Sequence, residues 1–139
     1  MGEIRVKVQL GNESDFLLEE LGKLGQKKPR EAQVDALVDT GAVMILLPQD
    51  LVEKLGLKKL DKAIVSLAND EKIEMDIAGT LVISIAGRTW RTDCLVGPPG
   101  CEPLIGQLVL ERLDLILDPL KRAVTPRPES PYLPSLKLK

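Results

Sequence analysis

The sequence predicts a single domain that is mainly β-sheet, with one or two short helices. Short segments in which apolar and polar residues alternate recur along the chain, a pattern typical of strands with one buried face. Glycine and proline separate these segments, as they do in hairpins. A length of 139 residues suffices for one hydrophobic core but not for two.

The first part of the chain is expected to hold three strands and a helix. In order, the expected elements are a strand at 4–10, a long polar loop with at most one helical turn at 11–30, a strand at 31–38, a short buried strand at 43–47 and a helix at 48–55. Pro48 suits the first position of a helix, and Gly56 supplies a left-handed stop.

The second part is expected to form two hairpins, a short helix and a last strand. The expected elements are strands at 63–68, 72–77, 81–85 and 89–96, a helix at 107–113 and a core strand at 115–117. Asn69-Asp70 and Ala86-Gly87 provide the two hairpin turns. Trp90 is the one large side chain available to fill the core.

The chain divides into a domain at 1–118 and a proline-rich C-terminal arm at 119–139. Prolines cannot donate to a central strand, so we expect this arm to be extended, either docked or disordered. Its prolines beyond the domain are Pro119, Pro126, Pro128, Pro131 and Pro134. No internal repeat and no second domain are expected.

Composition excludes several classes of function. Histidine is absent, which removes Ser-His and Cys-His nucleophile pairs, most zinc sites and the usual general base near neutral pH. The 19 basic and 21 acidic residues give no basic field for nucleic acid, and three aromatic residues cannot build a base-stacking platform. We therefore expect no nucleic-acid partner, no metal and no cofactor, and any acid–base chemistry must come from carboxylates.

The cysteines and the hydropathy pattern indicate a cytoplasmic protein. Cys94 and Cys101 are too few for a disulfide framework, and we expect both to be reduced. No apolar run approaches the roughly 18 residues of a membrane-spanning helix, and the N-terminus has no apolar signal region. We expect a soluble protein without a membrane partner.

Asp39-Thr40-Gly41-Ala42 is the candidate catalytic segment. An apolar strand delivers Asp39, and the chain returns at once to apolar residues. An Asp between two core-seeking segments is either a turn residue, since Asp and Gly both favour turns, or a chemical one. Taken alone, the tripeptide Asp-Thr-Gly leaves both interpretations open.

A second motif favours the chemical interpretation of Asp39 over the turn interpretation. Leu104-Ile105-Gly106 follows the strand-rich middle of the chain and leads into a short helix. With Asp39-Thr40-Gly41-Ala42, it resembles the retropepsin-like aspartic proteases, the single-domain family that includes the retroviral proteases, over roughly residues 32–118. Two motifs in the same order are far more specific than either one.

The resemblance implies a closed acid-protease β-barrel that works as a homodimer. Asp39 of two identical chains would meet on a two-fold axis and share one proton, one carboxyl acting as general base on a water and the other polarising the scissile carbonyl. Thr40 would join the two loops by hydrogen bonds, and Gly41 would permit close approach. Ala42 replaces the hydroxyl residue usual in pepsin-like enzymes, which implies a less acidic optimum than that of pepsin.

The resemblance also implies a flap over the substrate, at the hairpin tip. This tip comprises Ala68, Asn69, Asp70 and Glu71, with Ile64, Ile73 and Met75 nearby to contact a peptide or protein substrate. It lacks the glycines of retroviral flaps, and Gln107 replaces the retroviral arginine after the second-motif glycine. Two functions fit these residues: an aspartic endopeptidase, or a catalytically weak dimerisation or peptide-binding module with the same fold.

Overall fold

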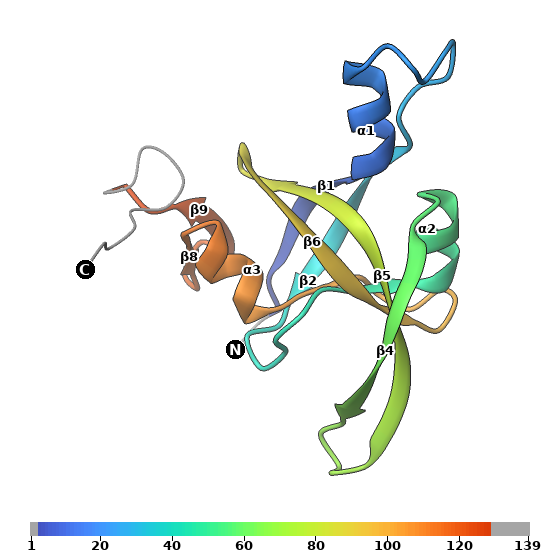
Figure 1. The fold of residues 1–139 in the computed structure, drawn as a ribbon. Helices are drawn as coiled ribbons and strands as arrows, with labels where there is room; N and C mark the ends of the chain where they lie inside the picture. Colours follow the sequence, from blue (N-terminus) through green and yellow to red (C-terminus); the bar gives the residue numbers. More distant parts are fainter. Residues whose placement is uncertain (1–2, 129–139) are drawn as a thin grey trace, which may run out of the picture.

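A seven-stranded sheet carries most of the chain in the computed structural model, which describes residues 3–128 (Figure 1). Its strand order is β1-β2-β7-β3-β6-β5-β4, and β1 also pairs with β5, so the pairing returns to the first strand. The fold is mainly β, as predicted. The strands are β1 (Arg5–Asn12), β2 (Glu31–Val38), β3 (Leu46–Pro48), β4 (Lys58–Ser66), β5 (Lys72–Ile85), β6 (Arg88–Gly97) and β7 (Leu104–Ile105).

Three short helices and a separate two-stranded sheet complete the described residues. The helices are α1 (Glu13–Glu20), α2 (Gln49–Lys54) and α3 (Gln107–Arg112), and the small sheet pairs β8 (Leu115–Asp118) with β9 (Ala123–Pro126). Pro48 lies at the N-cap position, one residue before α2 begins, and β3 is shorter than the strand expected at 43–47. Within residues 3–128, no helix is long and apolar enough to cross a membrane.

The core is aliphatic and lies on one face of the curved sheet. Val8 and Leu10 of β1 and Ala36 of β2 are buried, while the residues that alternate with them point to solvent. Trp90 is only partly buried and packs against the edge of this core, with the guanidinium of Arg112 5.9 Å from the centre of its ring. Aliphatic side chains, not the tryptophan, therefore fill the centre.

The expectation of a long loop at 11–30 was wrong in part. β1 continues to Asn12, and the eight-residue helix α1 follows directly. The Asn12 side chain caps this helix by accepting a hydrogen bond from the Asp15 backbone N–H at 3.1 Å. Local capping of this kind stabilises a helix start that its weak apolar pattern alone does not predict.

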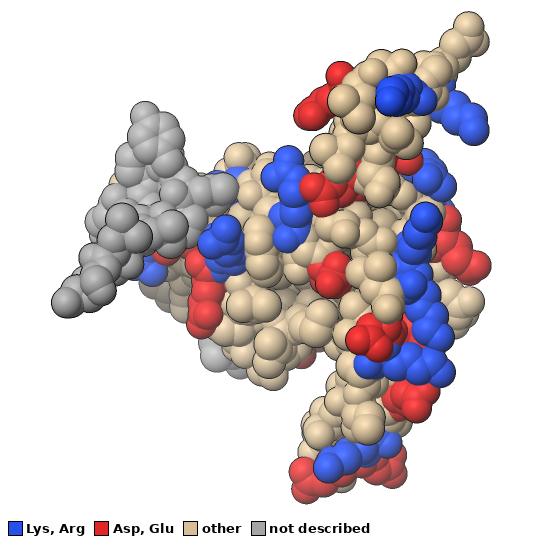
Figure 2. All heavy atoms as spheres, viewed as in Figure 1, with Lys and Arg blue, Asp and Glu red and all other residues tan. Residues whose placement is uncertain are grey.

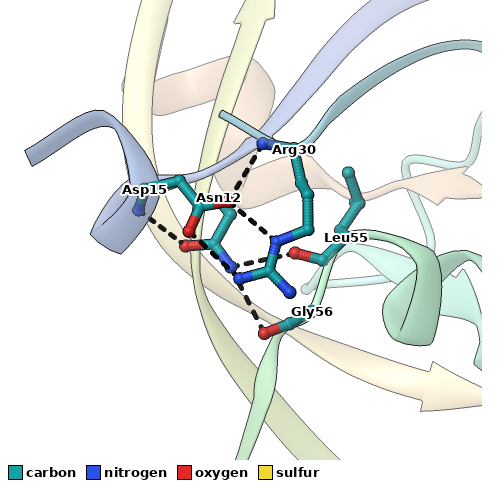
Figure 3. Close-up of polar contacts among 5 residues, drawn as sticks. All are labelled: Asn12, Asp15, Arg30, Leu55 and Gly56. Atoms are coloured by element: carbon teal, nitrogen blue, oxygen red, sulfur yellow. Dashed lines mark hydrogen bonds and ion pairs between the residues drawn. The ribbon is translucent and has the colours of Figure 1, made fainter. Parts of the chain in front are cut away.

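Asp15 connects the start of α1 to Arg30, at the end of the segment that leads into β2 (Figure 3). Its carboxylate accepts hydrogen bonds from the Nε (2.8 Å), Nη2 (3.0 Å) and backbone N–H (3.0 Å) of Arg30. The Asn12 amide donates to the carbonyls of Leu55 and Gly56, just after α2. The Arg30 guanidinium also lies where a Cβ at position 56 would be, so the glycine leaves it room.

Asp15→Asn is expected to destabilise the fold by about 1–2 kcal/mol, since it weakens charge-assisted hydrogen bonds to a half-exposed arginine. Hydrogen bonding by Arg30 holds the pKa of Asp15 below its usual value. The stabilisation is therefore complete above a pH of about 4 and disappears as pH falls through the lower folded-state pKa. Urea unfolding at pH 7 and pH 3 measures this, with the exposed Glu19→Gln as control. A variant equally destabilised at both values would contradict it.

The expectation of two separate strands at 72–77 and 81–85 was wrong. One strand, β5, runs through both and pairs with β4 and β6, with a register shift between Ala78 and Leu81. The small residues there suggested an interruption. A Cβ at the buried position Gly79 would collide with the Asp93 carboxylate of β6, so the glycine leaves room for this side chain within a continuous strand.

The start of the C-terminal arm, which we expected to be extended and either docked or disordered, pairs as a strand. β9 forms an antiparallel ladder with β8, with Leu115 opposite Pro126. Proline is tolerated there because it ends the strand. Residues 129–139 lie outside the described part of the chain, so the division into a domain at 1–118 and an arm at 119–139 stays a prediction.

Candidate active site

Backbone hydrogen bonds hold Asp39 directly after β2. Its N–H donates to the carbonyl of Ile105 at 3.0 Å, and its carbonyl accepts from the N–H of Ala42 at 3.1 Å, which closes a tight turn. The Gly41 N–H donates to Oδ1 of the carboxylate at 3.0 Å. These hydrogen bonds orient the carboxylate. Because Asp39 is only half-buried, the carboxylate stays accessible from outside.

The second motif lies directly against this loop. β7 runs parallel to β2, with Leu104 beside Leu37 and Ile105 beside Val38. The next residues continue the contact, as the N–H of Gln107 donates to the carbonyl of Ala42 at 2.8 Å. Thus the two segments that the sequence singled out, far apart along the chain, form one unit.

Gly106 is required by this close approach. A Cβ at that position would lie 2.5 Å from the carbonyl oxygen of Val43 and 2.8 Å from that of Ala42, both backbone atoms. Any side chain there would push the aspartate loop away from β7. On the outer surface of the loop, Thr40 and Gly41 are exposed and Ala42 is half-buried.

The outward face of β2 changes from polar to apolar just before Asp39. Glu31, Gln33 and Asp35 point outward and are exposed, as expected for a solvated sheet face. Leu37 continues the same alternation but is apolar and half-buried. Asp39 follows two residues later on this face, so an apolar surface begins where the carboxylate lies.

Leu37 begins an apolar band across the sheet, which we call the aliphatic row. Residues paired in register share a face, so the pairings place its members side by side on the face opposite the core. From strand to strand, the row consists of Leu37, Leu104, Leu46, Leu95 and Ile77. All five are half-buried, and Asp39 lies at one edge of the row.

The β4–β5 hairpin carries the predicted flap segment at its tip. Figure 1 shows this hairpin extending from the lower end of the molecule, the same end as the loop after β2. The turn is closed by hydrogen bonds from the Asp70 N–H to the Leu67 carbonyl at 3.0 Å and from the Leu67 N–H to the Glu71 carbonyl at 2.8 Å. Ala68, Asn69, Asp70 and Glu71 are exposed, and Figure 2 shows acidic side chains at this end.

The register divides the hairpin into an apolar and a polar face. Ala63 pairs with Met75 and Val65 with Ile73, on the face that β5 shares with Ile77 of the aliphatic row. Ile64, which we had grouped with Ile73 and Met75, instead pairs with Glu74 on the opposite face and is 75% exposed. This alternation removes Ile64 from the candidate substrate contacts.

A cavity of about 500 Å³ lies elsewhere, between α2 and the base of the hairpin. Its lining includes Ala78 and Val96, which point to the core face of the sheet, and also Ile73 and Met75 of the apolar hairpin face. Asp39 is not part of its lining. This cavity therefore reaches the apolar face of the hairpin but not the candidate catalytic carboxylate.

A family model decides which family the chain represents. The model described as "gag-polyprotein putative aspartyl protease" matches residues 30–112, more than half of the chain, including both motifs. The chain belongs to this family. Its retropepsin-like fold is supported by a solved structure, "EIAV protease complexed with the inhibitor HBY-793", with 16% identity and a TM-score of 0.59. That similarity covers 81% of this chain and 89% of the EIAV chain. None of the curated proteins matches the chain.

Some residues of the candidate site in this aspartyl protease family member could not be recognised from its sequence. The sequence pattern assigns Leu37, Leu46 and Leu95 only to strands, because their common face depends on pairings between distant segments. Arg5 alternates in sequence like an ordinary polar strand residue, yet it pairs with Glu102 beside the aliphatic row. For Leu37 a signal was present, since it is the one apolar residue on the outward face of β2.

Proposed function

We propose that the protein is a homodimeric aspartic endopeptidase in which Asp39 of each chain supplies one of two catalytic carboxyls. The observation that carries this proposal is the orientation of Asp39 by the loop at the open edge of the aliphatic row, in a member of an aspartyl protease family. Two carboxyls that share a proton can serve as general base and general acid at once.

The chain contributes one half of such a site. Asp39 is its single Asp-Thr-Gly aspartate, and no internal repeat supplies a second one. The loop around it exposes Thr40 and Gly41, which leaves its outer surface available to an identical loop. A two-fold axis through this surface would bring the two carboxyls together.

The aliphatic row and the apolar hairpin face favour a particular substrate geometry. An extended peptide could lie between them, with its backbone paired in strand fashion and its apolar side chains against Leu37 and Leu104. Apolar residues on both sides of the scissile bond would then be preferred. Because burial of each such side chain is worth about 1.5–3 kcal/mol, this preference would be strong.

The alternative is a peptide-binding or dimerisation module with little catalysis, which the well-closed, glycine-free hairpin tip favours. Turnover separates the two functions. The purified chain, incubated with a denatured protein from pH 4 to 7, is expected to produce fragments that an aspartic-protease inhibitor suppresses. Binding of peptides without any inhibitor-sensitive cleavage over this range would establish the module instead.

A further inference from the structure

An ion pair closes the aliphatic row at the end nearest β1. The Nε of Arg5 donates to Oε1 of Glu102 at 2.6 Å, and a second guanidinium nitrogen of Arg5 lies 2.9 Å from a carboxylate oxygen of Glu3. The Arg5 and Glu102 side chains remain 45% and 41% exposed. Both are therefore within reach of a molecule that lies along the row.

The register fixes how far this ion pair lies from the catalytic aspartate. Arg5 is directly opposite Leu37, and Leu37 precedes Asp39 by two residues. Strands about 4.8 Å apart with a rise of about 3.3 Å per residue place the backbones of Arg5 and Asp39 about 8 Å apart. An extended substrate covers that distance in two to three residues.

Glu102 approaches the same level from the other side of β2. The N–H of Leu37 donates to the carbonyl of Pro103 at 2.9 Å, so residues 102–103 run beside Leu37 just before β7 begins. Arg5 and Glu102 thus reach each other across the end of β2. The sequence separation of 97 residues means that only the folded sheet brings them together.

The charges at this end of the row do not cancel. Two carboxylates, Glu3 and Glu102, face the one guanidinium of Arg5, which leaves one negative charge in excess. Two residues further from Asp39 along the same pair of strands, Lys7 lies opposite Asp35, and their opposite charges cancel. A cationic side chain is therefore favoured here over an anionic one.

We propose that Glu102, held in place by Arg5, makes the enzyme prefer substrates with a lysine or arginine two or three residues from the scissile bond. The apolar residues next to the cut occupy the aliphatic row, and the basic side chain reaches the Glu102 carboxylate at its end. This selectivity rests on the proposed endopeptidase function. Arg5 is a positioning residue that orients Glu102 through their hydrogen bond.

A peptide series tests this selectivity. The peptides share apolar residues at the cut and carry lysine, glutamine or glutamate two or three residues away, on either side. We expect kcat/KM to fall in the order lysine, glutamine, glutamate by about twofold to fivefold per step, the size of a solvent-exposed charge interaction. The difference should lie mainly in KM and should shrink at high salt.

Glu102→Gln is expected to remove the difference between the lysine and glutamate peptides. Glu74→Gln is the matched control, because it breaks the similarly exposed ion pair with Lys62 on the polar face of the hairpin. A lysine-to-glutamate ratio that Glu102→Gln leaves unchanged, or that Glu74→Gln lowers equally, would overturn the proposal.

Binding to the Asp39→Asn protein separates this proposal from the proteolytic function. Fluorescence anisotropy with the same labelled peptides is expected to show tighter binding of the lysine peptide, and loss of that difference when Glu102→Gln is added. Failure of the wild-type chain to cleave any peptide would refute the endopeptidase while this measurement still decides the charge selectivity. Equal binding of all three peptides would refute the selectivity.

Discussion

Asp39→Asn is expected to abolish peptide hydrolysis. The amide has nearly the same shape as the carboxyl but can neither take a proton from water nor share one with its partner. General acid–base catalysis contributes about 10²–10⁴-fold, so activity should fall to about a thousandth of the wild-type value or below. The assay is cleavage of an apolar peptide at matched protein concentration.

The fold and the association state of this variant should be unchanged. Backbone hydrogen bonds from the Asp39 N–H to the Ile105 carbonyl and from the Ala42 N–H to the Asp39 carbonyl hold the loop, and an amide oxygen can still accept from the Gly41 N–H. Asp35→Asn is a suitable control, since Asp35 lies on the same outward face of β2 but away from the aliphatic row. Substantial activity in Asp39→Asn, with thermal unfolding and mass like the wild type, would remove Asp39 from the catalytic role.

Mixing Asp39→Asn chains with wild-type chains is expected to lower the activity per wild-type chain. With three Asp39→Asn chains for each wild-type chain, random exchange leaves about a quarter of the wild-type chains with a wild-type partner. Activity per wild-type chain should therefore fall to about a quarter. If instead activity follows only the amount of wild-type chain after verified exchange, each chain holds a complete site and the shared-carboxyl mechanism is wrong.

Dilution probes the same dependence without a variant. Below the dissociation constant of the dimer, the rate per milligram should fall towards zero, because each separation removes an active site. A light-scattering mass at the same concentrations shows whether the loss follows dissociation.

The parts of the site that depend on local sequence could be predicted. A carboxylate between two apolar segments marks the candidate loop Asp39-Thr40-Gly41-Ala42. A position just before a helix marks the second motif, Leu104-Ile105-Gly106. Alternation identified β1 and β2, because one face of each is buried. These signals reside within a few neighbouring residues.

The rest depends on pairings between distant segments. Leu37 joins the aliphatic row only because β7 lies beside β2, and Arg5 meets Glu102 only because β1 and the segment before β7 flank β2. The helix α1 is a different case, since Asn12 is a preferred N-cap residue and acidic residues follow in the first turn, a local signal that the weak apolar pattern obscures. The continuity of β5 was hidden because Gly79 looks like a break when its close neighbour is unknown.

The length of β5 bears on how the hairpin can move. The N-terminal half of this strand forms one arm of the hairpin, and its C-terminal half supplies Leu81, Ile83 and Ile85, which are at most 1% exposed. We expect an arm anchored in this way to bend as a unit and not to unfold at its tip. We expect the bend to occur at the register shift between Ala78 and Leu81, where the pairing of β5 with β6 is irregular. Substrate entry and product release would then depend on how rigidly β5 pairs with β6, and not on the turn at Asn69 and Asp70.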